Sequence, residues 1–374
     1  MRITEPPAPT TVRSPMSRHG ATPGPTRSGP TMHDVAAAAG VSQATVSLVL
    51  NDAGGVRVSE ETRQRVHQAA RELGYRTNAH AKVLRDGVAG MIGFVGDHVA
   101  TAPFAGKIIE GAQARAWEAG MLLLTVNTGG DKDLEAASLE AMLSHKVAGV
   151  VYASMYHQEV DVPDALGEVP AVVLNARDRS GTFASIAPSE VVGGRTATTK
   201  LLDAGHRRIG FINIGAVEDG LPAVVGRLEG YRAALAEAGI EYDGDLHRAG
   251  DGQEAGGHRE TLRLMALDQP PTAIFCGNDR TAWGAYQALA SLGLTVPDDV
   301  SVVGFDNQES LAPHLRPGLT TLELPFIDMG RRAVELILAG TPSPGHTELF
   351  ECPLVDRHSV AAPPHLPNQR TGTA

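Results

Sequence analysis

The 374-residue sequence lacks the features of a secreted, disulfide-stabilised or membrane-spanning protein. Its two cysteines, Cys276 and Cys352, are too few for a disulfide framework and fit free thiols in a reducing compartment. No apolar run reaches the ~18 residues of a membrane span. The N-terminal stretch has no apolar segment typical of a secretory signal. These absences predict a cytoplasmic protein with no membrane partner.

Signatures of catalysis are also missing. There is no G-x-G-x-x-G after a strand, no Walker loop and no H-E-x-x-H, and the fourteen histidines show no metal-ligand spacing. Asp279 and Asp306 could be imagined as a glycosidase pair, but the sequence supplies no distance between them. We therefore expect no enzymatic activity, no metal and no cofactor.

The net charge of −11 would by itself argue against a nucleic-acid partner, but it is unevenly distributed. Residues 1–87 carry eleven Lys and Arg against seven Asp and Glu, a net +4, which leaves −15 for the rest. This asymmetry is compatible with a DNA-binding front on an acidic body. Residues 1–30 are dominated by Pro, Ser, Thr, Gly and Arg, and we expect a disordered extension there.

Residues 31–51 predict two short helices separated by a tight turn. Thr31 is a plausible N-cap for a helix over 32–39, Gly40 ends that helix, and Ser42 caps a second one that runs to about Asn51. A three- to four-residue turn containing Gly is typical of a helix-turn-helix. The expected shared core is Val35, Ala38, Val41, Val46 and Val49. The alternative is a small helical hairpin from some larger core.

In a helix-turn-helix the N-terminal residues of the second helix meet base edges in the major groove. Small side chains at Ala44 and Ser47 let that helix approach closely. Gln43 can pair with adenine, and Thr45 can reach a phosphate or a thymine methyl group.

Two more helices are expected before the body. Ser59 caps a third helix that ends at Gly74, and its buried stripe is Val66, Ala69, Ala70 and Leu73. A fourth, from Asn78 to Leu84, is too short to be stable alone in water and should order only on DNA or across a dimer. Lys82 is available for a phosphate, and an apolar side chain on such a helix can wedge between base steps in the minor groove. A plain linker helix is the alternative.

Residues 31–87, here called the headpiece, resemble the LacI/GalR family of bacterial transcriptional regulators. The matching stretches include Asp34-Val35-Ala36, Ala39-Gly40-Val41-Ser42, Val58-Ser59-Glu60-Glu61-Thr62-Arg63 and Leu73-Gly74-Tyr75. The resemblance implies a homodimer, a near-palindromic operator and a hinge helix from each subunit, with Leu84 as the minor-groove lever. The residues predicted to contact DNA are Thr31, Ser42, Gln43, Ala44, Thr45, Ser47, Leu48, Asn51, Arg57, Thr62, Tyr75, Asn78, Ala81, Lys82 and Leu84.

The headpiece departs from the family pattern at three positions. Leu48 stands where the family usually has an arginine that contacts a base, so base preference there must differ. Thr77 replaces a frequent proline before the hinge. Lys82 replaces a frequent arginine, which turns a bidentate fork into a point charge.

From residue 91 onward the chain alternates between short apolar runs and helical patterns. Strands are expected at 91–96, 121–126, 147–153, 171–175, 208–214, 273–277 and 301–306. Helices are expected at 107–119, 134–145, 190–204, 226–238 and 280–292, and the family resemblance implies a last helix near 326–338 that returns to the first subdomain. This alternation predicts an α/β fold with doubly wound parallel sheets, whose ligands sit beyond the carboxyl ends of the strands.

Polar residues gather at those predicted strand ends. Asn175 and Asp306 end strands, Asn278 and Asp279 follow another, and Arg227 is expected to open a helix. Carboxylates, amides and an arginine can together bind hydroxyl groups in fixed geometry. Phe104 and Phe326 could stack on a sugar ring. For any single residue an ordinary capping or turn role remains the alternative, and Asp279 in particular would cap the helix after it.

The body continues the family resemblance, for example at Gly205-His206-Arg207-Arg208-Ile209, Arg227-Leu228-Glu229-Gly230-Tyr231 and Leu319-Thr320-Thr321-Leu322. The resemblance implies two α/β subdomains like those of periplasmic sugar-binding proteins, with an effector in the cleft. It places Asn175, Arg227, Asn278, Asp306 and Phe326 at effector-contacting positions; Phe104 and Asp279 complete the predicted set. Ala105 and Ser189-Glu190 depart from the family pattern near this cleft, so no known effector is transferred.

The expected organisation has five parts: a disordered extension at 1–30, a helix-turn-helix domain at 31–77, a hinge helix at 78–87, an effector-binding and dimerisation domain at 88–360, and a flexible tail at 361–374. The two subdomains are expected at about 88–190 with 322–352, and about 191–321 with 353–360. The tail has no leucine heptads, which favours a dimer over a tetramer.

The leading hypothesis is a sequence-specific DNA-binding repressor under allosteric control by a small ligand, most simply a carbohydrate. A nucleobase co-repressor is a variant of this hypothesis in which ligand tightens DNA binding. The pattern of the body would also fit a transport-type solute-binding protein, but in such a protein the helix-turn-helix would have no function.

Overall fold

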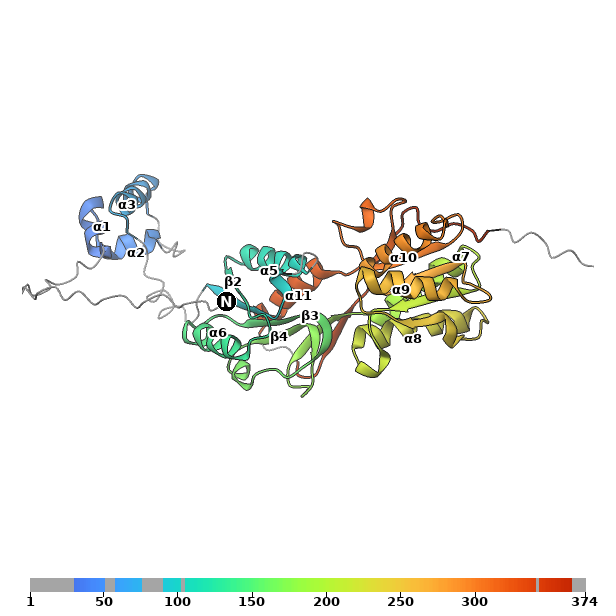
Figure 1. Ribbon diagram of the computed structural model, residues 1–374. Helices are drawn as coiled ribbons and strands as arrows, with labels where there is room; N and C mark the ends of the chain where they lie inside the picture. Colours follow the sequence, from blue (N-terminus) through green and yellow to red (C-terminus); the bar gives the residue numbers. More distant parts are fainter. Residues whose placement is uncertain (1–29, 51–57, 76–89, 102–104, 341–342, 365–374) are drawn as a thin grey trace, which may run out of the picture. The chain divides into compact units, whose positions relative to one another are not determined.

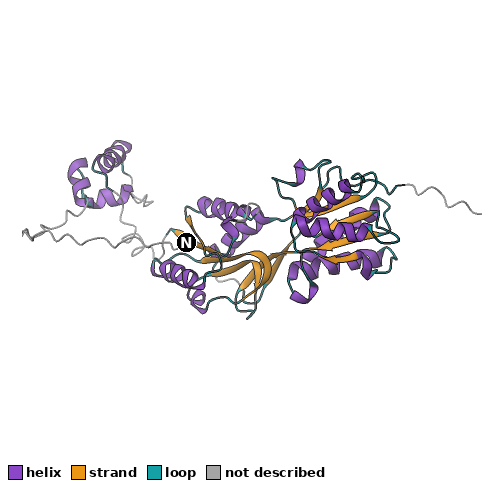
Figure 2. Cartoon of the chain, in the orientation of Figure 1, coloured by secondary structure: helices purple, strands orange, loops and turns teal. Residues whose placement is uncertain are grey.

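The computed structural model describes residues 30–50, 58–75, 90–101, 105–340 and 343–364. The chain forms two compact units, Met1–Lys82 and Val83–Ala374. Figure 2 shows that the first unit contains helices, whereas the second contains two groups of strands flanked by helices. Residues 1–29 of the extension predicted at 1–30, the predicted hinge helix at 78–87 and residues 365–374 of the tail lie outside the described residues.

The first unit contains α1 (Met32–Ala39), α2 (Gln43–Leu50) and α3 (Glu60–Glu72), which pack on one another (Figure 1). Thr31 and Asp34 form a reciprocal capping box on α1, and Gly40 ends that helix with a left-handed φ of 65°. The side chain of Ser59 caps α3. The core consists of Val35, Ala36, Ala39, Val46, Val49, Val66, Ala69 and Ala70.

Two expectations for this small core were wrong. Ala38 is exposed, and Ala36 and Ala39 face inward instead, because the buried face of α1 is rotated from the predicted one. Leu73 is 39% exposed because it follows the last turn of α3, where the buried stripe has already ended. Val41 is only partly buried.

The first sheet of the body contains six parallel strands in the order β11-β5-β4-β3-β1-β2. Their bounds are β1 Met91–Gly96, β2 Leu122–Asn127, β3 Val150–Val160, β4 Ala171–Asp178, β5 Ala184–Pro188 and β11 Thr347–Phe350. Helices α5 (Gly106–Glu118) and α11 (Phe326–Leu338) pack together, and α6 (Lys132–Ser144) contacts β1 (Figure 1). Strands β3 and β4 run past their predicted ends, with an irregular register between Ala153 and Gln158.

The second sheet has the order β12-β10-β9-β8-β6-β7, and only β12 is antiparallel. Its strands are β6 Ile209–Asn213, β7 His247–Ala249, β8 Ala273–Cys276, β9 Ser301–Asp306, β10 Thr320–Glu323 and β12 Leu354–Val355. Helices α7 (Glu190–Asp203) and α8 (Pro222–Glu237) pack as one pair, and α9 (Glu254–Met265) and α10 (Asp279–Ser291) as another. Short 3₁₀ helices occur at Val99–Thr101, Asp164–Glu168, Val217–Asp219, Gly244–Leu246 and Ala312–His314.

Side chains on the two faces of the second sheet belong to two different hydrophobic clusters. Phe211 and Phe275 belong to the cluster that includes residues of α7 and α8, whereas their neighbours Ile212 and Ile274 belong to the cluster of α9 and α10. Successive side chains of a strand point to opposite faces, so the two helix pairs cover opposite faces of this sheet. The prediction of doubly wound parallel sheets is confirmed.

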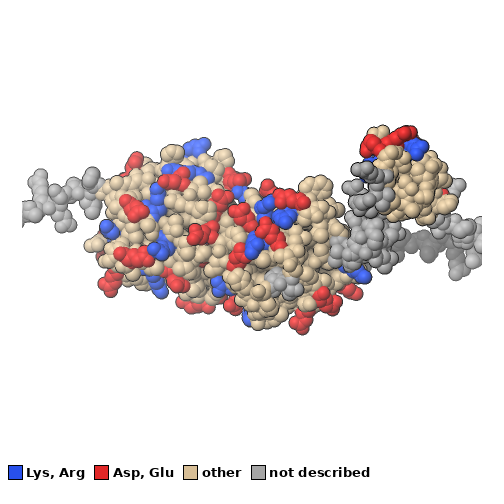
Figure 3. Space-filling model, turned by 180° about the vertical axis from the view of Figure 1, so that it is seen from behind, with Lys and Arg blue, Asp and Glu red and all other residues tan. Residues whose placement is uncertain are grey.

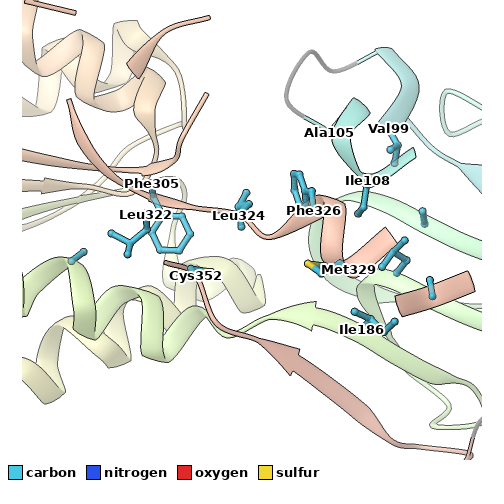
Figure 4. Close-up of a cluster of buried hydrophobic side chains, with 14 of the residues drawn as sticks. Val99, Ala105, Ile108, Ile186, Phe305, Leu322, Leu324, Phe326, Met329 and Cys352 are labelled. Atoms are coloured by element: carbon cyan, nitrogen blue, oxygen red, sulfur yellow. The ribbon is translucent and has the colours of Figure 1, made fainter. Parts of the chain in front are cut away.

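The chain passes between the two sheets three times: from β5 to α7, from β10 to α11 and from β11 to β12. Figure 4 shows Leu322, Leu324 and Phe326 along the second of these crossings. The three side chains belong to one buried cluster that extends into both lobes. β10 ends at Glu323, so this crossing begins after the predicted subdomain limit at 322.

Ala361, close to the end of the described residues, is hydrogen-bonded to residues of the second lobe. The carbonyl of Ala361 accepts hydrogen bonds from Ser301 Oγ, at 3.2 Å, and lies 3.0 Å from His206 Nε2. Its own N–H donates to Ser301 Oγ at 3.0 Å. The expectation of a flexible tail is therefore wrong for Ala361. Within the described part of the chain, no helix is long and apolar enough to cross a membrane.

Candidate functional site

The N-terminal edge of α2 is the most accessible part of the helix-turn-helix. Ser42, Gln43 and Ala44 are exposed, and Thr45 and Leu48 are half-buried. The Ser42 hydroxyl accepts a hydrogen bond from the Thr45 N–H at 3.1 Å, so it caps the helix as predicted. Gln43 and Ala44 are thus presented to solvent on the first turn of α2. That is the turn that reaches base edges in this motif.

The other predicted DNA contacts in the described headpiece lie near helix starts or against the core. Thr31 caps α1, and Thr62 occupies the first turn of α3, where its N–H donates to Ser59 Oγ. Helix N-termini favour anions such as phosphates. Tyr75 packs on the core, and Ser47 is half-buried. The predicted contacts outside the described residues are Asn51, Arg57, Asn78, Ala81, Lys82 and Leu84.

A polar cleft lies between the two sheets of the body, at the carboxyl ends of several strands. Three adjoining cavities of about 60, 160 and 160 Å³ occupy it. The first is lined by Met155, Tyr156, His157, Asn175, Glu190, Ile214, Ala223, Arg227, Asn278, Asp306, Leu324 and Phe326. Asn175, Arg227, Asn278, Asp306 and Phe326, which come from five different elements, are thus brought together as predicted. Phe104 lies outside the described residues.

A buried ion pair forms one wall of the smallest cavity. Arg227 Nε donates to Glu190 Oε2 at 2.8 Å, and both side chains are 4% exposed. The guanidinium also donates to the Gly277 carbonyl, and its Cζ atom lies 3.7 Å from the centre of the Phe305 ring. Burial by itself raises the pKa of Glu190, but Arg227 and His157 outweigh it and lower the pKa to about 2. Glu190 is therefore an ionised carboxylate at neutral pH.

The position of Arg227 in its helix corrects one prediction. Arg227 does not open a helix, because α8 begins at Pro222 and continues to Glu237. Its side chain nevertheless reaches the cavity, since α8 and α7 pack against each other at glycines such as Gly194. A Cβ atom on Gly194 would lie 2.4 Å from the Arg227 carbonyl oxygen, so only glycine fits this contact.

Two asparagines build the cavity wall with their amide groups. Asn175 has a left-handed φ of 55°, and its Nδ2 donates to the carbonyls of Ser154 and Met155. Asn278 caps α10 by accepting from the Thr281 N–H at 2.8 Å, and its Nδ2 donates to Gly252 O at 3.0 Å. These hydrogen bonds hold loops from both lobes around the cavity.

The two aspartates have different roles. Asp306 lines the cavity, and burial raises its pKa to about 6, with Arg227 acting in the opposite direction. Asp279 is fully buried and does not line any of the three cleft cavities. Its carboxylate accepts from Thr321 Oγ1 at 2.6 Å and from the Gln308 N–H at 2.7 Å. Asp279 therefore holds Gln308 and Thr321 in place and does not face the cavities. Asn278 rather than Asp279 caps α10.

Several residues of the cleft were not predicted from the sequence. Glu190 was recognised only as a departure from the family pattern near the cleft. That departure was the one feature of the sequence that could have identified it as a cleft residue. His157, Tyr156 and Gln308 carry no motif, yet all three line the cleft. His157 Nδ1 lies 3.2 Å from Glu190 Oε1, which adds a third member to the buried pair.

A separate cavity of about 280 Å³ lies beside α6 at the ends of β1 and β3. Four acidic residues, Asp97, Glu135, Glu159 and Asp161, and one basic residue, Lys132, are among those that line it. The buried groups there are already paired, since Tyr152 Oη donates to Glu135 and Ser154 Oγ donates to Asp97. Among the described residues, no three or more His, Cys, Asp or Glu side chains are placed so that they could hold a metal ion together.

Comparisons with known proteins place both parts of the chain. Residues 31–78 match the bacterial regulatory proteins of the lacI family, and residues 198–360 match a periplasmic binding protein-like domain. The regulator GalR of Escherichia coli K12 is 34% identical over 341 residues, covering 89% of this chain and 96% of that protein.

Two solved structures are similar over most of the chain. A lac repressor dimer bound to operator and the anti-inducer ONPF has a TM-score of 0.73 and 27% identity, covering 90% of this chain and 100% of that one. A complex of the transcriptional regulator CelR with cellobiose has a TM-score of 0.60 and 31% identity, covering 88% and 99%. A helix-turn-helix front, a two-lobed cleft and these full-length likenesses agree: the chain is a DNA-binding transcriptional regulator, not an enzyme, and belongs to the LacI family.

Proposed function

We propose that this regulator is a repressor that binds a near-palindromic operator as a homodimer and is controlled allosterically by a small carbohydrate. The observation that carries the proposal is a helix-turn-helix joined to a body whose two lobes enclose a polar cleft. In this proposal a hinge helix at 78–87 connects the helix-turn-helix to the body. Ligand in the cleft would change the relation of the lobes and, through the hinges of two subunits, operator affinity.

Base reading is assigned to the exposed first turn of α2, with Gln43 as its main hydrogen-bonding side chain. The described headpiece holds three arginines, Arg63, Arg65 and Arg71, against four acidic residues, Asp34, Glu60, Glu61 and Glu72. The excess positive charge of residues 1–87 therefore lies outside the described residues. Phosphate neutralisation is accordingly assigned to flanking residues such as Arg57 and Lys82.

Exposed apolar side chains of the body support a dimer. Trp117, at the end of α5, is 71% exposed, and Leu122 and Leu124 on the edge strand β2 are 59% and 39% exposed. Trp283 on α10 is 38% exposed. Tryptophan is enriched in interfaces between proteins, and exposed apolar areas of this kind mark them.

Figure 3 shows acidic and basic side chains intermixed on one face of the body, without a large area of one sign.

The chemistry of the cleft supports a carbohydrate. Amides, a carboxylate and a guanidinium converge on its cavities beside Phe326 and Tyr156, and hydroxyl groups need such donors and acceptors together with an apolar surface. Cavities of about 60 and 160 Å³ are small compared with the roughly 300–1,000 Å³ of pockets for drug-sized ligands. A ligand of monosaccharide size is the proposed occupant.

The test is the fluorescence anisotropy of DNA from the protein's own upstream promoter, as salt is varied and ligands are added. We expect affinity to fall steeply with salt and one of D-galactose, D-glucose or D-ribose to change it. Tightening by guanine instead would identify a nucleobase co-repressor. Binding no better than to random DNA, with no response to any ligand, would overturn the proposal.

Removing the cleft's guanidinium needs a variant that still folds. Arg227→Ala leaves Glu190 as an unpaired buried charge, so loss of function in that variant would be ambiguous. The double variant Arg227→Met/Glu190→Gln removes both charges. It should keep operator binding and lose the ligand response; an unchanged response would refute the cleft assignment.

A further inference from the structure

His157 lies in a stretch of β3 where the strand register of the first sheet is irregular. Between Ala153 and Gln158 the pairing of β3 with β4 is interrupted, and the Asn175 amide holds this stretch by donating to the carbonyls of Ser154 and Met155. Met155, Tyr156 and His157 consequently all line the smallest cleft cavity. The interruption turns the histidine side chain toward the second lobe, where it meets Glu190.

The proton positions on the His157 ring follow from its partner. Glu190 is ionised and can only accept, and its two oxygens face Arg227 Nε at 2.8 Å and His157 Nδ1 at 3.2 Å. Nδ1 must therefore carry a proton in order to donate to Oε1. In the neutral ring the other nitrogen, Nε2, is then left with a lone pair and no proton.

That second nitrogen is buried without a partner among the described residues. The His157 side chain is 3% exposed, and Nε2 forms no hydrogen bond with any of them. Buried polar atoms are rarely left unsatisfied, because each costs the full loss of its hydration. Since His157 lines a cavity, the missing donor can come from a molecule inside it.

We propose that His157 Nε2 is an effector contact that accepts a hydrogen bond from a ligand hydroxyl, and that Glu190 is the positioning residue that fixes the ring. This inference rests on the proposed function and narrows it. The effector must present a hydroxyl donor at this point, so an analogue with a hydrogen, a fluorine or a methoxy group there is rejected. Loss of this one bond should weaken binding about ten- to a hundredfold.

The ligand test is isothermal titration calorimetry of the full chain with D-galactose, D-glucose and D-ribose and with the monodeoxy and monofluoro analogues of each. For the sugar that binds, one position should be intolerant of both replacements in the wild type. In His157→Phe the parent sugar should bind about ten- to a hundredfold more weakly, and the penalty at that one position should vanish. A penalty that persists in His157→Phe would overturn the inference.

His247→Phe is the matched control. His247 also has a buried Nε2 without a partner among the described residues, but it lies at the start of β7, stacked on Phe211, and does not line the cleft cavities. This variant should retain the wild-type pattern of analogue binding. Equal losses in both variants would indicate general destabilisation and count against a ligand contact.

The role of Glu190 has a readout that needs no ligand. Imidazole ¹⁵N chemical shifts, assigned by difference with His157→Phe, should show His157 with its proton on Nδ1 in the wild type. Glu190→Gln, whose amide can donate as well as accept, should mix the two tautomers. A wild-type protein that binds none of the sugars would overturn the proposed carbohydrate effector and this inference with it, whereas sugar binding with an Nε2-protonated ring would overturn this inference alone.

Discussion

The buried pair of Glu190 and Arg227 allows a quantitative prediction for Arg227→Met. The substitution keeps much of the side-chain volume but leaves Glu190, which is 4% exposed, without its main counter-charge. In the wild type the pKa of Glu190 falls from 4.5 to about 2, and a shift of that size corresponds to about 3 kcal/mol. Breaking a buried pair by removing one partner costs about 3–5 kcal/mol in general. We expect a loss within that range at pH 7.

The sign of the pH dependence follows from the same shift. A carboxyl group whose folded pKa is depressed stabilises the fold above its unfolded pKa, and this contribution is lost as the pH falls from about 4.5 to about 2. In Arg227→Met burial is opposed only by His157, so Glu190 takes up a proton more easily. The difference in unfolding free energy between wild type and variant should therefore shrink between pH 7 and pH 4.

The assay is urea unfolding followed by tryptophan fluorescence. Both tryptophans, Trp117 and Trp283, belong to the body, so the signal reports on this unit rather than on the headpiece. Adding Glu190→Gln to Arg227→Met should restore most of the lost stability, because the amide oxygen can still accept from His157. A loss below about 1 kcal/mol in the single variant, or no recovery in the double variant, would refute the reasoning.

Three further predictions address other parts of the chain. Burial raises the pKa of Asp306 to about 6, so ionisation of this group should lower the stability of the wild type by about 3 kcal/mol as the pH rises from about 4 to about 6. Asp306→Asn should remove this decline, and equal slopes for the two proteins in pH-dependent urea titrations would contradict the prediction. Gly230→Ala should destabilise the body by about 1–3 kcal/mol or more and lower its melting temperature, since the added Cβ atom would lie 2.1 Å from the Val191 carbonyl oxygen. Gly106→Ala is the control and should leave the melting temperature unchanged, because nothing lies within 4 Å of its added Cβ atom; similar melting curves for the two variants would contradict the close contact of α7 with α8. Gln43→Ala should weaken operator binding by about 1–3 kcal/mol in an anisotropy assay while leaving binding to random DNA unchanged, and an equal loss on both DNAs would argue against base reading.

Regular patterns predicted most of the elements of this fold. β1 and β9 begin and end at the predicted residues, because a continuous apolar run marks each of them. Strands β5, β7, β10, β11 and β12 and helix α9 were not predicted. Among them, β7 and β12 are edge strands of only three and two residues. Such short edge strands form because neighbouring strands offer hydrogen-bonding partners, and their own sequences carry little β signal.

The candidate site was predictable only in part. Residues at family motif positions, such as Arg227 and Asn278, were identified, although Pro222 as the start of α8 was overlooked as a helix signal. The partnership of Glu190 with Arg227 and His157 joins three elements far apart in the chain. Local patterns carry no information about such a contact, because it depends on how α7 and α8 pack and on the irregular end of β3.

The three crossings between the sheets bear on how relatives of this protein can diverge. Neither lobe is a continuous stretch of sequence, so a single recombination event cannot exchange one lobe for that of a homologue without splitting its sheet. The helix-turn-helix, in contrast, is contiguous and can be replaced at one junction. Target sites on DNA can therefore change by swapping a module, whereas ligand preference must change residue by residue. Chimeras joined near residue 82 should accordingly keep the ligand response of the protein that supplies the body.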